Sequence, residues 1–321
     1  MTIHHQHRSD IRTMTQSLEN IRRKYVETLE PILGKPFPVL DDGFIRVVDY
    51  MGSDDSIVQA ARVAYGKGTK KLRQDRELIR YLIRHHHTSP LEMCEIKFHV
   101  RVPMDTWRQW IRHRTANVNE YSTRYSIAID AALKTKPDAW RAQAKSNRQG
   151  SASQVDEKMG KKLTQKENEL HILTREVYKE RIDAGIAREQ ARKDLPLSTY
   201  TEAYWKIDLN NLLHFLQLRM DDHAQYEIRC YANIVGNEIV QRWCPMTWEA
   251  FLDYRMNSLS FSTAEQDILK WIGKGQAQKA IDTAEAHGWL PRKEGRLKNH
   301  IERSEFEEKL ERLGISIPWA K

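Results

Sequence analysis

The sequence predicts an α+β fold, in which an antiparallel sheet packs with several long helices and no Rossmann unit is present. Few segments alternate between apolar and polar residues, whereas many show helical spacing. Neither GxGxxG nor GxxxxGK[ST] occurs, so a doubly wound nucleotide-binding fold is not expected. With 321 residues, of which 40% are hydrophobic, most of the chain can bury a core instead of remaining disordered.

The first 130 residues contain both extended and helical patterns. Apolar residues alternate from Cys94 to Val102, which predicts a strand with one buried face. Between residues 56 and 65, Ile57, Ala60, Ala61 and Ala64 fall on one helical face. The elements expected here are a helix over 14–34 that ends at Gly34, a turn at 41–43, strands over 44–50 and 94–102, and helices over 56–65, from about 78 to 85, and over 105–113.

The remaining chain is mainly helical. Leu209, Leu212, Leu213 and Leu216 follow the i, i+3, i+4, i+7 spacing of an apolar helical stripe. We expect a polar loop over 131–162, helices over 163–184, 187–193, 208–219 and 223–243, a shorter helix from 247, and a strand over 198–207. This order predicts three parts, namely a helical arm over 1–43, a domain over 44–256 and an appended helical segment over 257–321.

Composition limits the partners and the compartment. Lys and Arg number 52 against 44 Asp and Glu, and the net charge of +8 suits either nucleic acid or small phosphorylated ligands. No apolar run is long enough to span a membrane, and the first residues lack the apolar stretch of a secretion signal. Three cysteines, Cys94, Cys230 and Cys244, are too few for a disulfide scaffold or a zinc site. We therefore expect a cytoplasmic protein with neither a metal site nor a membrane partner.

The densest cluster of polar residues lies between residues 101 and 126, a segment that contains five arginines but only one Asp and one Glu. On a helix over 105–113, one face carries Trp107, Trp110 and Ile111 and the other carries Arg108, Gln109, Arg112 and His113. The helix is expected to end there, so that Arg114 turns to a partner of its own. Crowded guanidiniums repel one another unless an anion lies opposite. In the extended segment that follows, Glu120, Ser122 and Arg124 share one side, as in a ligand-binding loop.

Three interpretations of this cluster remain open on the residues alone. It can be a solvated basic face of a structural helical protein. It can be the contact surface of a nucleic-acid-binding module, because tryptophans lie among its arginines. It can also bind a small anionic ligand in an enzyme, which Glu120 favours because a carboxylate would repel a polyphosphate backbone but suits a sugar or a base edge.

Arg112-His113-Arg114, seven further residues and then Ser122 resemble the signature of the flavin-dependent thymidylate synthases. Segments 87–92, 192–197 and 218–229 resemble further family segments in the family's order, and the resemblance covers about 44–255. It implies conversion of dUMP to dTMP, with methylenetetrahydrofolate as carbon donor and NADPH-reduced FAD as hydride source. It also implies a homotetramer whose sites are shared between subunits, with no nucleic-acid partner.

The resemblance assigns most of the cluster to two ligands. The implied dUMP site consists of Gln109, Arg112, Glu120, Ser122, Arg124, Arg192 and Arg219. The implied FAD site consists of Ser89, Arg112, His113, Arg114, Glu120, Asp208, Asn210 and His214. Arg124 and Arg192 are expected to bind the phosphate, and Arg219 to be catalytic by polarising the uracil ring. The helical spacing independently places Asn210 and His214 together on a face away from the leucine stripe.

Expectations for the remaining candidates are weaker. We expect His87 to line the folate or flavin pocket, with His223 as a further pocket candidate, and His85 and His86 to lie on the surface. His223 and Gln225 are also expected to orient Arg219. None of the three cysteines has the neighbours of an activated nucleophile. Because Ser122 has no nearby base except Glu120, we assign it to binding. The expected reaction therefore forms no covalent bond between the enzyme and the nucleotide.

Overall fold

The computed structural model describes residues 23, 25–63, 72–143, 151–291 and 299–320. The chain divides into two compact units, Met1–Met256 and Asn257–Lys321, and each is described by itself. The helix predicted over 14–34 lies partly outside the described residues. The part that is described contains a 3₁₀ turn, Glu30–Ile32, in place of an α-helix. Within the predicted arm over 1–43, β1 (Phe37–Val39) pairs with the next strand and so belongs to the sheet.

A five-stranded antiparallel sheet forms the centre of the first unit, which confirms the predicted α+β class. Its order is β1, β2 (Gly43–Met51), β3 (Glu95–Pro103), β7 (Tyr200–Asp208) and β4 (Asn117–Glu120). The predicted alternation in β3 is confirmed, because Ile96, Phe98, Val100 and Val102 are buried. β4 was not predicted, and all four of its residues are exposed.

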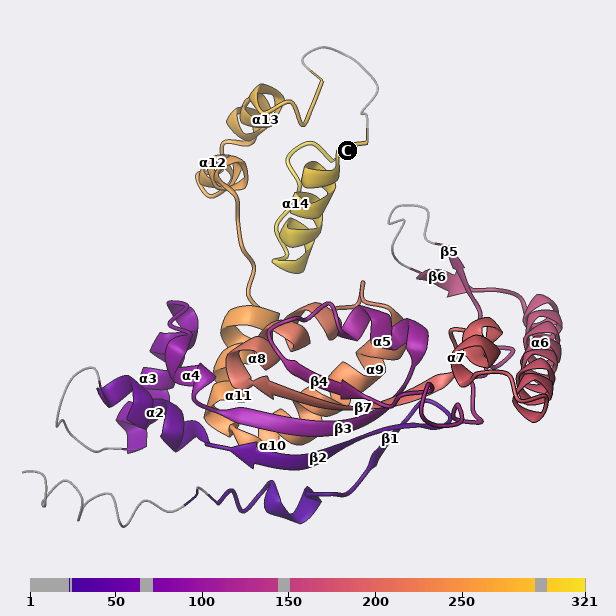
Figure 1. Ribbon diagram of the computed structural model, residues 1–321. Coiled ribbons are helices and arrows are strands. Elements are labelled where there is room, and N and C mark those ends of the chain that lie inside the picture. Colours follow the sequence, from indigo (N-terminus) through magenta and orange to yellow (C-terminus); the bar gives the residue numbers. More distant parts are fainter. Residues whose placement is uncertain (1–22, 24, 64–71, 144–150, 292–298, 321) are drawn as a thin grey trace, which may run out of the picture. The chain divides into compact units, whose positions relative to one another are not determined.

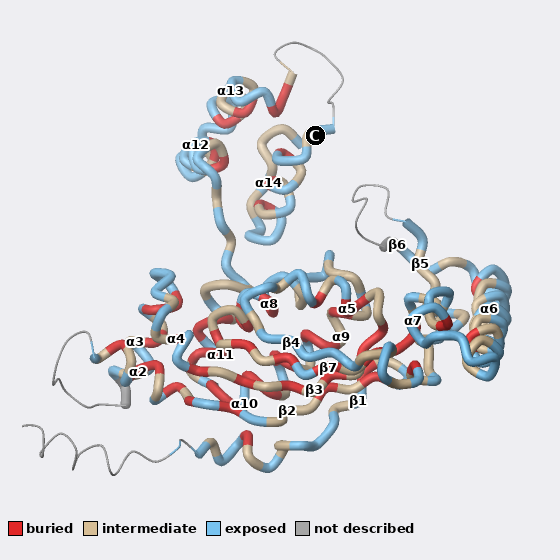
Figure 2. Tube along the Cα trace, viewed as in Figure 1, coloured by how far each residue is buried: buried red, intermediate tan, exposed pale blue. Residues whose placement is uncertain are grey.

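Helices α5 (Met104–Trp110), α8 (Leu209–Arg219) and α9 (Tyr226–Ile234) lie over one face of this sheet (Figure 1). The Trp110 indole lies at the centre of the contact, with its ring centroid 5.2 Å from Trp205 of β7, 5.1 Å from Phe215 of α8 and 5.5 Å from Tyr231 of α9. Figure 2 shows the buried residues concentrated in this layer. The aromatic cluster thus fixes the end of α5, where the basic motif begins.

The other helices of this unit pack beside the sheet. They are α2 (Asp54–Val63), α3 (Leu72–Arg84), α4 (Ser89–Glu92), α10 (Gln241–Trp243) and α11 (Pro245–Phe251). Two π-helical segments, Val235–Val240 and Leu252–Met256, interrupt the helical stretches that the sequence predicted over 223–243 and from 247. Buried Asp54 joins α2 to α11 because its carboxylate accepts hydrogen bonds from the backbone N–H groups of Met246 (2.8 Å) and Thr247 (3.1 Å).

The predicted loop over 131–162 is only partly a loop. It contains a short hairpin of β5 (Arg141–Gln143) and β6 (Ser151–Gln154) and the first turn of α6 (Glu157–Asp183). Asp156 begins α6 earlier than expected, because its carboxylate accepts a hydrogen bond from the Met159 N–H. α7 (Arg188–Ala191) and a 3₁₀ turn, Arg192–Asp194, follow and lead into β7.

The second unit consists of α12 (Thr263–Ile272), α13 (Ala277–Ala286) and α14 (Ile301–Arg312) around a small core of its own that includes Ile268, Trp289 and Phe306. α12 begins with a capping box between Ser262 and Glu265. Across both units, none of the described helices combines the length and the apolar character that a membrane span requires.

Candidate active site

The basic motif begins where α5 ends, which is earlier than the sequence predicted. Helical backbone angles stop at Ile111, and the N–H groups of Arg112 and His113 bond instead to the carbonyls three residues before them, in a tight turn. Arg112 and His113 therefore do not continue the polar face of a helix. The turn brings the His113 ring against Phe215 of α8, with ring centroids 4.9 Å apart.

Arg219, at the end of α8, contacts His113 directly. The guanidinium Nε donates a hydrogen bond to the His113 Nε2 across 3.1 Å. Burial, the Arg219 charge and the His214 charge together lower the pKa of His113 from 6.5 to about 4. Burial also lowers the pKa of Arg219. His113 is therefore neutral at physiological pH, and this neutral imidazole lies beside a desolvated cation.

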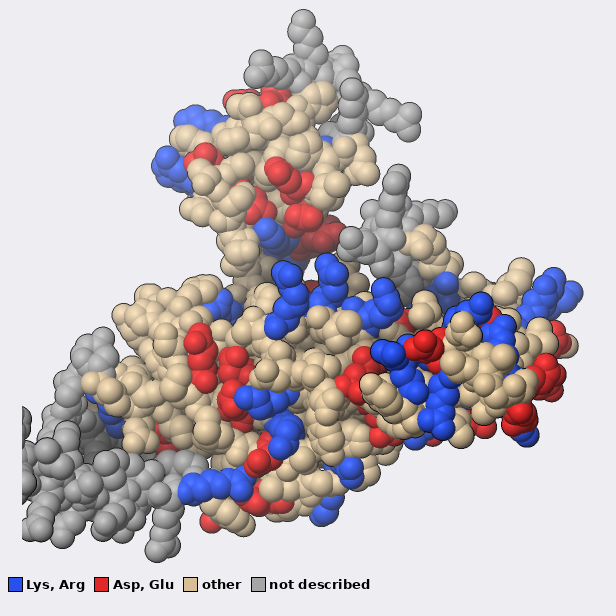
Figure 3. Space-filling model, in the orientation of Figure 1, with Lys and Arg blue, Asp and Glu red and all other residues tan. Residues whose placement is uncertain are grey.

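Three arginines around this turn have no counter-charge. The side chains of Arg108, Arg112 and Arg114 are exposed and form no hydrogen bond or ion pair with the other described residues. The partner expected for Arg114 is therefore not found in this part of the chain. Figure 3 shows basic side chains gathered over α5. This surface suits an anionic ligand, since uncompensated guanidiniums bind phosphate oxygens well.

β4 leads from this turn to the predicted nucleotide loop. Glu120 is the last residue of β4, and its carboxylate accepts a hydrogen bond of 2.9 Å from the hydroxyl of Thr201 in β7. Thr201 was missed because a threonine in a buried strand gives no functional signal. Ser122 begins a turn after the strand, where its hydroxyl accepts a hydrogen bond from the Arg124 N–H at 3.4 Å.

The segment 120–126 is also tied to α7 and the 3₁₀ turn after it, which explains how Arg192 joins the loop. The guanidinium of Arg192 donates a hydrogen bond to the Thr123 hydroxyl. Arg124 forms an ion pair with Glu189 at 3.1 Å, and both side chains are more than half exposed. The structure thus brings together Ser122, Arg124 and Arg192, three of the residues assigned to the nucleotide.

Gln109 lies on α5 and is half-buried, and its amide donates a hydrogen bond to Gln225. Gln225 in turn donates to the Asp105 carboxylate at 3.3 Å. His223 is exposed and pairs with Asp221 at 2.8 Å. No described contact joins His223 or Gln225 to Arg219, so the expectation that they orient Arg219 is not supported by the geometry.

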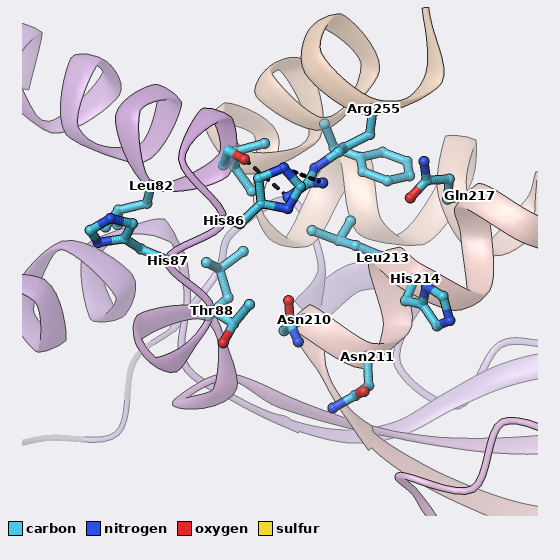
Figure 4. Close-up of a pocket in the computed structure, with 13 residues that line it drawn as sticks. Leu82, His86, His87, Thr88, Asn210, Asn211, Leu213, His214, Gln217 and Arg255 are labelled. Atoms are coloured by element: carbon cyan, nitrogen blue, oxygen red, sulfur yellow. Dashed lines mark hydrogen bonds between the residues drawn. The ribbon is translucent and has the colours of Figure 1, made fainter. Parts of the chain in front are cut away.

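A cavity of about 330 Å³ lies between the end of α3, α4, α8 and the segment after α11 (Figure 4). Asn210 and His214, which the resemblance assigned to FAD, line it together with His87, whereas His223 is not among its lining residues. His86, which is exposed as expected, also lines it, and so does Arg255, which the sequence did not single out. No carboxylate occurs among the described residues that line this cavity.

Two further residues assigned to FAD, Asp208 and Ser89, also lie outside this cavity. Asp208 is the N-cap of α8, and its carboxylate accepts hydrogen bonds from the backbone and side-chain N–H groups of Asn211 at 2.9 and 2.7 Å. This capping explains Asp208 without a ligand. Ser89 lines a neighbouring apolar cavity of about 450 Å³, which shares His87 with the first.

The arrangement can bind two anionic or hydrogen-bonding ligands. The 120–126 loop offers a carboxylate, hydroxyls and guanidiniums, which together match a nucleoside monophosphate. The turn at 112–114 and the cavity offer cations, the neutral imidazole of His113, further imidazoles and amides. Arg219 contacts the turn through His113, and its desolvated guanidinium is able to stabilise negative charge on a ligand.

Comparisons with known proteins identify the family to which the chain belongs. Residues 46–246 match the family model described as thymidylate synthase complementing protein. The chain is 51% identical over 258 residues to a flavin-dependent thymidylate synthase of Wolbachia pipientis wMel, covering 80% of this chain and 90% of that protein. It is 48% identical over 269 residues to the flavin-dependent thymidylate synthase of Ehrlichia ruminantium (strain Gardel), covering 84% and 90%.

A solved structure is also similar. The crystal structure of the UMP/dUMP methylase PolB from Streptomyces cacaoi, bound with 5-Br dUMP, has a TM-score of 0.62 and 30% sequence identity, and covers 70% of this chain and 100% of that one. Its fold agrees with the antiparallel sheet and helical layer described above. The match of the family model over most of the central domain and the high identity to these relatives show that the chain is a methyltransferase of the flavin-dependent thymidylate synthase family.

Proposed function

We propose that the protein converts dUMP to dTMP with methylenetetrahydrofolate as carbon donor and NADPH-reduced FAD as hydride source, and that no cysteine attacks the uracil. The observation that carries this proposal is the contact between Arg219 and the neutral His113, beside the uncompensated Arg112 and Arg114. If the basic residues were only a solvated surface of a structural protein, nothing would require a desolvated guanidinium next to an imidazole that burial keeps neutral.

The nucleotide is assigned to Gln109, Arg112, Glu120, Ser122, Arg124, Arg192 and Arg219. Arg124 and Arg192 bind its phosphate, which requires Arg124 to exchange its exposed partner Glu189 for the ligand. Thr201 orients the Glu120 carboxylate toward the sugar or the base. Arg219, by donating to the uracil edge, stabilises the negative charge that develops as the ring carbon becomes nucleophilic.

The residues present fit FAD. The cavity of about 330 Å³ offers amides, imidazoles and one guanidinium, with no carboxylate among its described lining residues to repel a pyrophosphate. Asn210, His214 and His87 would hold the cofactor from the cavity, and His113, Arg112 and Arg114 from the turn. When bound, the flavin supplies the hydride that completes the methyl group. Because His113 accepts from Arg219 through Nε2, its Nδ1 carries the proton and is available as a donor.

The cysteines support a reaction without a thiolate nucleophile. Cys94 and Cys244 are fully buried, and burial together with a hydrogen bond to Cys94 raises the pKa of the Cys244 thiol. Cys230 is half-buried, and burial raises the pKa of its thiol as well. Cysteine nucleophiles instead need an electropositive environment that lowers the pKa of the thiol.

We further propose a cytoplasmic homotetramer with no nucleic-acid partner, whose sites are shared between subunits. Exposed apolar side chains on α6, namely Leu170, Ile172 and Leu173, support an interface on this helix. The Glu120 carboxylate, exposed beside the arginines, is unfavourable for a polyphosphate backbone. Sedimentation velocity tests whether the protein is a tetramer in solution. Salt-dependent binding to random DNA in the absence of flavin would contradict the absence of a nucleic-acid partner.

An assay with dUMP, methylenetetrahydrofolate, NADPH and FAD tests the main proposal. We expect dTMP only when all four are present, together with the yellow absorbance of bound flavin. Arg219→Ala should abolish product and retain the flavin absorbance, whereas Arg242→Ala, at an exposed site paired with Glu238, should leave both unchanged. Full turnover by Arg219→Ala would refute the role of Arg219, and lack of product from the wild type would refute the activity.

A further inference from the structure

Arg255 places a guanidinium in the wall of the 330 Å³ cavity that Asn210 and His214 also line (Figure 4). Its Nη2 donates a hydrogen bond of 3.1 Å to the carbonyl of Ile83, and its Nη1 donates one of 3.2 Å to the Nε2 of His86. Since a guanidinium has five N–H donors, three remain available. Arg255 forms no ion pair with the described residues, and burial lowers its pKa. A half-buried cation without a counter-ion is costly unless an anion binds it.

His86 has an unusual backbone conformation. It follows the end of α3 with φ of 59°, in the left-handed region, where glycine or asparagine normally ends a helix. A histidine there costs conformational energy that glycine would avoid. Its imidazole faces the Arg255 guanidinium in the cavity, and it must accept at Nε2, since arginine cannot. Its Nδ1–H is then a further donor in the cavity wall.

Arg255 also lies in an unusual helix. The segment Leu252–Met256 is π-helical and follows Phe251, which is another residue of the cavity wall. Short π-helical segments are rare and frequently occur at functional sites. Residue 255 lies beyond the region 46–246 that the family model matches.

We propose that Arg255 and His86 form an anion subsite of this cavity, which binds a phosphate group of a dinucleotide coenzyme. This inference rests on the proposed function and adds two residues to its coenzyme site. FAD and NADPH both carry a pyrophosphate, and the subsite chemistry suits either. The amides of Asn210, Asn211 and Gln217 in the same wall supply the neutral hydrogen bonds that the rest of such a ligand requires.

A purely structural role makes different predictions. Arg255 caps α3 through the Ile83 carbonyl, and this bond alone would explain its position. If capping were its only function, loss of Arg255 would lower the melting temperature and leave coenzyme affinity unchanged. Replacement of His86 by glycine would likewise relieve the backbone and affect no ligand.

The test compares Arg255→Gln, Arg255→Lys and His86→Gly with the control Arg242→Gln in the full-length protein. Quenching of flavin fluorescence measures the Kd for FAD and for riboflavin, which has no phosphate, and steady-state rates give the KM for NADPH. We expect Arg255→Gln to weaken either FAD or NADPH about tenfold, which corresponds to about 1.4 kcal/mol. Riboflavin affinity should stay unchanged, and Arg255→Lys should recover part of the loss.

His86→Gly keeps the test valid if Arg255→Gln fails to fold. We expect it to preserve or raise the melting temperature and still weaken the same coenzyme. Unchanged affinity for both coenzymes in His86→Gly and Arg255→Gln, while wild type binds FAD and forms dTMP, overturns the subsite alone. An equal loss in Arg242→Gln also overturns it. A wild type that neither binds FAD nor forms dTMP overturns the proposed function, and the subsite with it.

Discussion

The Nε–H group of Arg219 donates a hydrogen bond to Nε2 of His113 across 3.1 Å, and this contact joins the end of α8 to the turn after α5. Because the acceptor nitrogen cannot carry a proton, the contact holds His113 in its neutral Nδ1–H tautomer. One residue assigned to the nucleotide thereby determines the protonation of a residue assigned to the flavin.

The protonation of His113 can be measured directly. Its pKa of about 4 lies below the unfolded value of 6.5, so the unfolded chain binds the proton first as the pH falls. The contribution of this group to the free energy of unfolding is fully present above pH 6.5 and is lost as the pH falls toward 4. NMR titration of the imidazole should show the low pKa, and Arg219→Met should raise it. A wild-type pKa near 6.5 would contradict the burial described here.

Thr201 is predicted to position Glu120 for the nucleotide. Thr201→Val keeps the shape of the side chain but removes the donor to the Glu120 carboxylate. Loss of one such hydrogen bond, worth about 1 kcal/mol, should raise the KM for dUMP about fivefold with little change in melting temperature. Thr199→Val is the matched control, since the buried Thr199 hydroxyl has no partner among the described atoms. Equal effects of both variants on KM would argue against the positioning role.

Glu189 is predicted to compete with the nucleotide phosphate for Arg124. Their ion pair is more than half exposed, so it contributes at most about 1 kcal/mol. Glu189→Gln should release Arg124 and lower the KM for dUMP up to about fivefold, most strongly at low ionic strength. Glu176→Gln, at an exposed position of α6, should have no effect. A raised KM in Glu189→Gln would show that Glu189 supports the binding geometry instead.

Removal of all three cysteines should preserve the chemistry and reduce stability. We expect the variant Cys94→Ala, Cys230→Ser, Cys244→Ala to form dTMP, because no thiol takes part in the proposed reaction. The melting temperature should fall, since the two fully buried thiols pack in the core and each truncation costs about 1 to 2 kcal/mol. Complete loss of turnover in a variant whose circular dichroism is native would reject the mechanism.

Elements with strong periodicity were predictable from the sequence. The alternation over 94–102 predicted β3, and the leucine stripe over 208–219 predicted α8 almost to the residue. β4 carried no such signal. Its side chains are all exposed, and it is stabilised by backbone pairing with β7. Such pairing between distant segments leaves no pattern of apolar residues in the local sequence.

The site was predictable in its residue types but not in its contacts. The sequence motif indicated Arg112, His113 and Ser122, yet the pairing of Arg124 with Glu189 joins residues 65 positions apart. Asp208 shows how ambiguous a residue type is, because a carboxylate before a helix serves equally as a ligand contact or as an N-cap. Arg255 lines the cavity from a π-helical segment. Because this segment departs from 3.6 residues per turn, α-helical spacing does not predict which way its side chains point.

Strand β7 separates the contact between Thr201 and Glu120 from the N-cap of α8. Thr201 near its start and Asp208 at its end are seven residues apart, which corresponds to about 23 Å of extended chain. A substitution of Thr201 is therefore expected to alter the contact with Glu120 without disturbing the cap that begins α8. An insertion of one residue before Trp205 would turn every later side chain to the opposite face and take the buried Trp205 and Ile207 out of the core, so the length of this strand is tightly constrained.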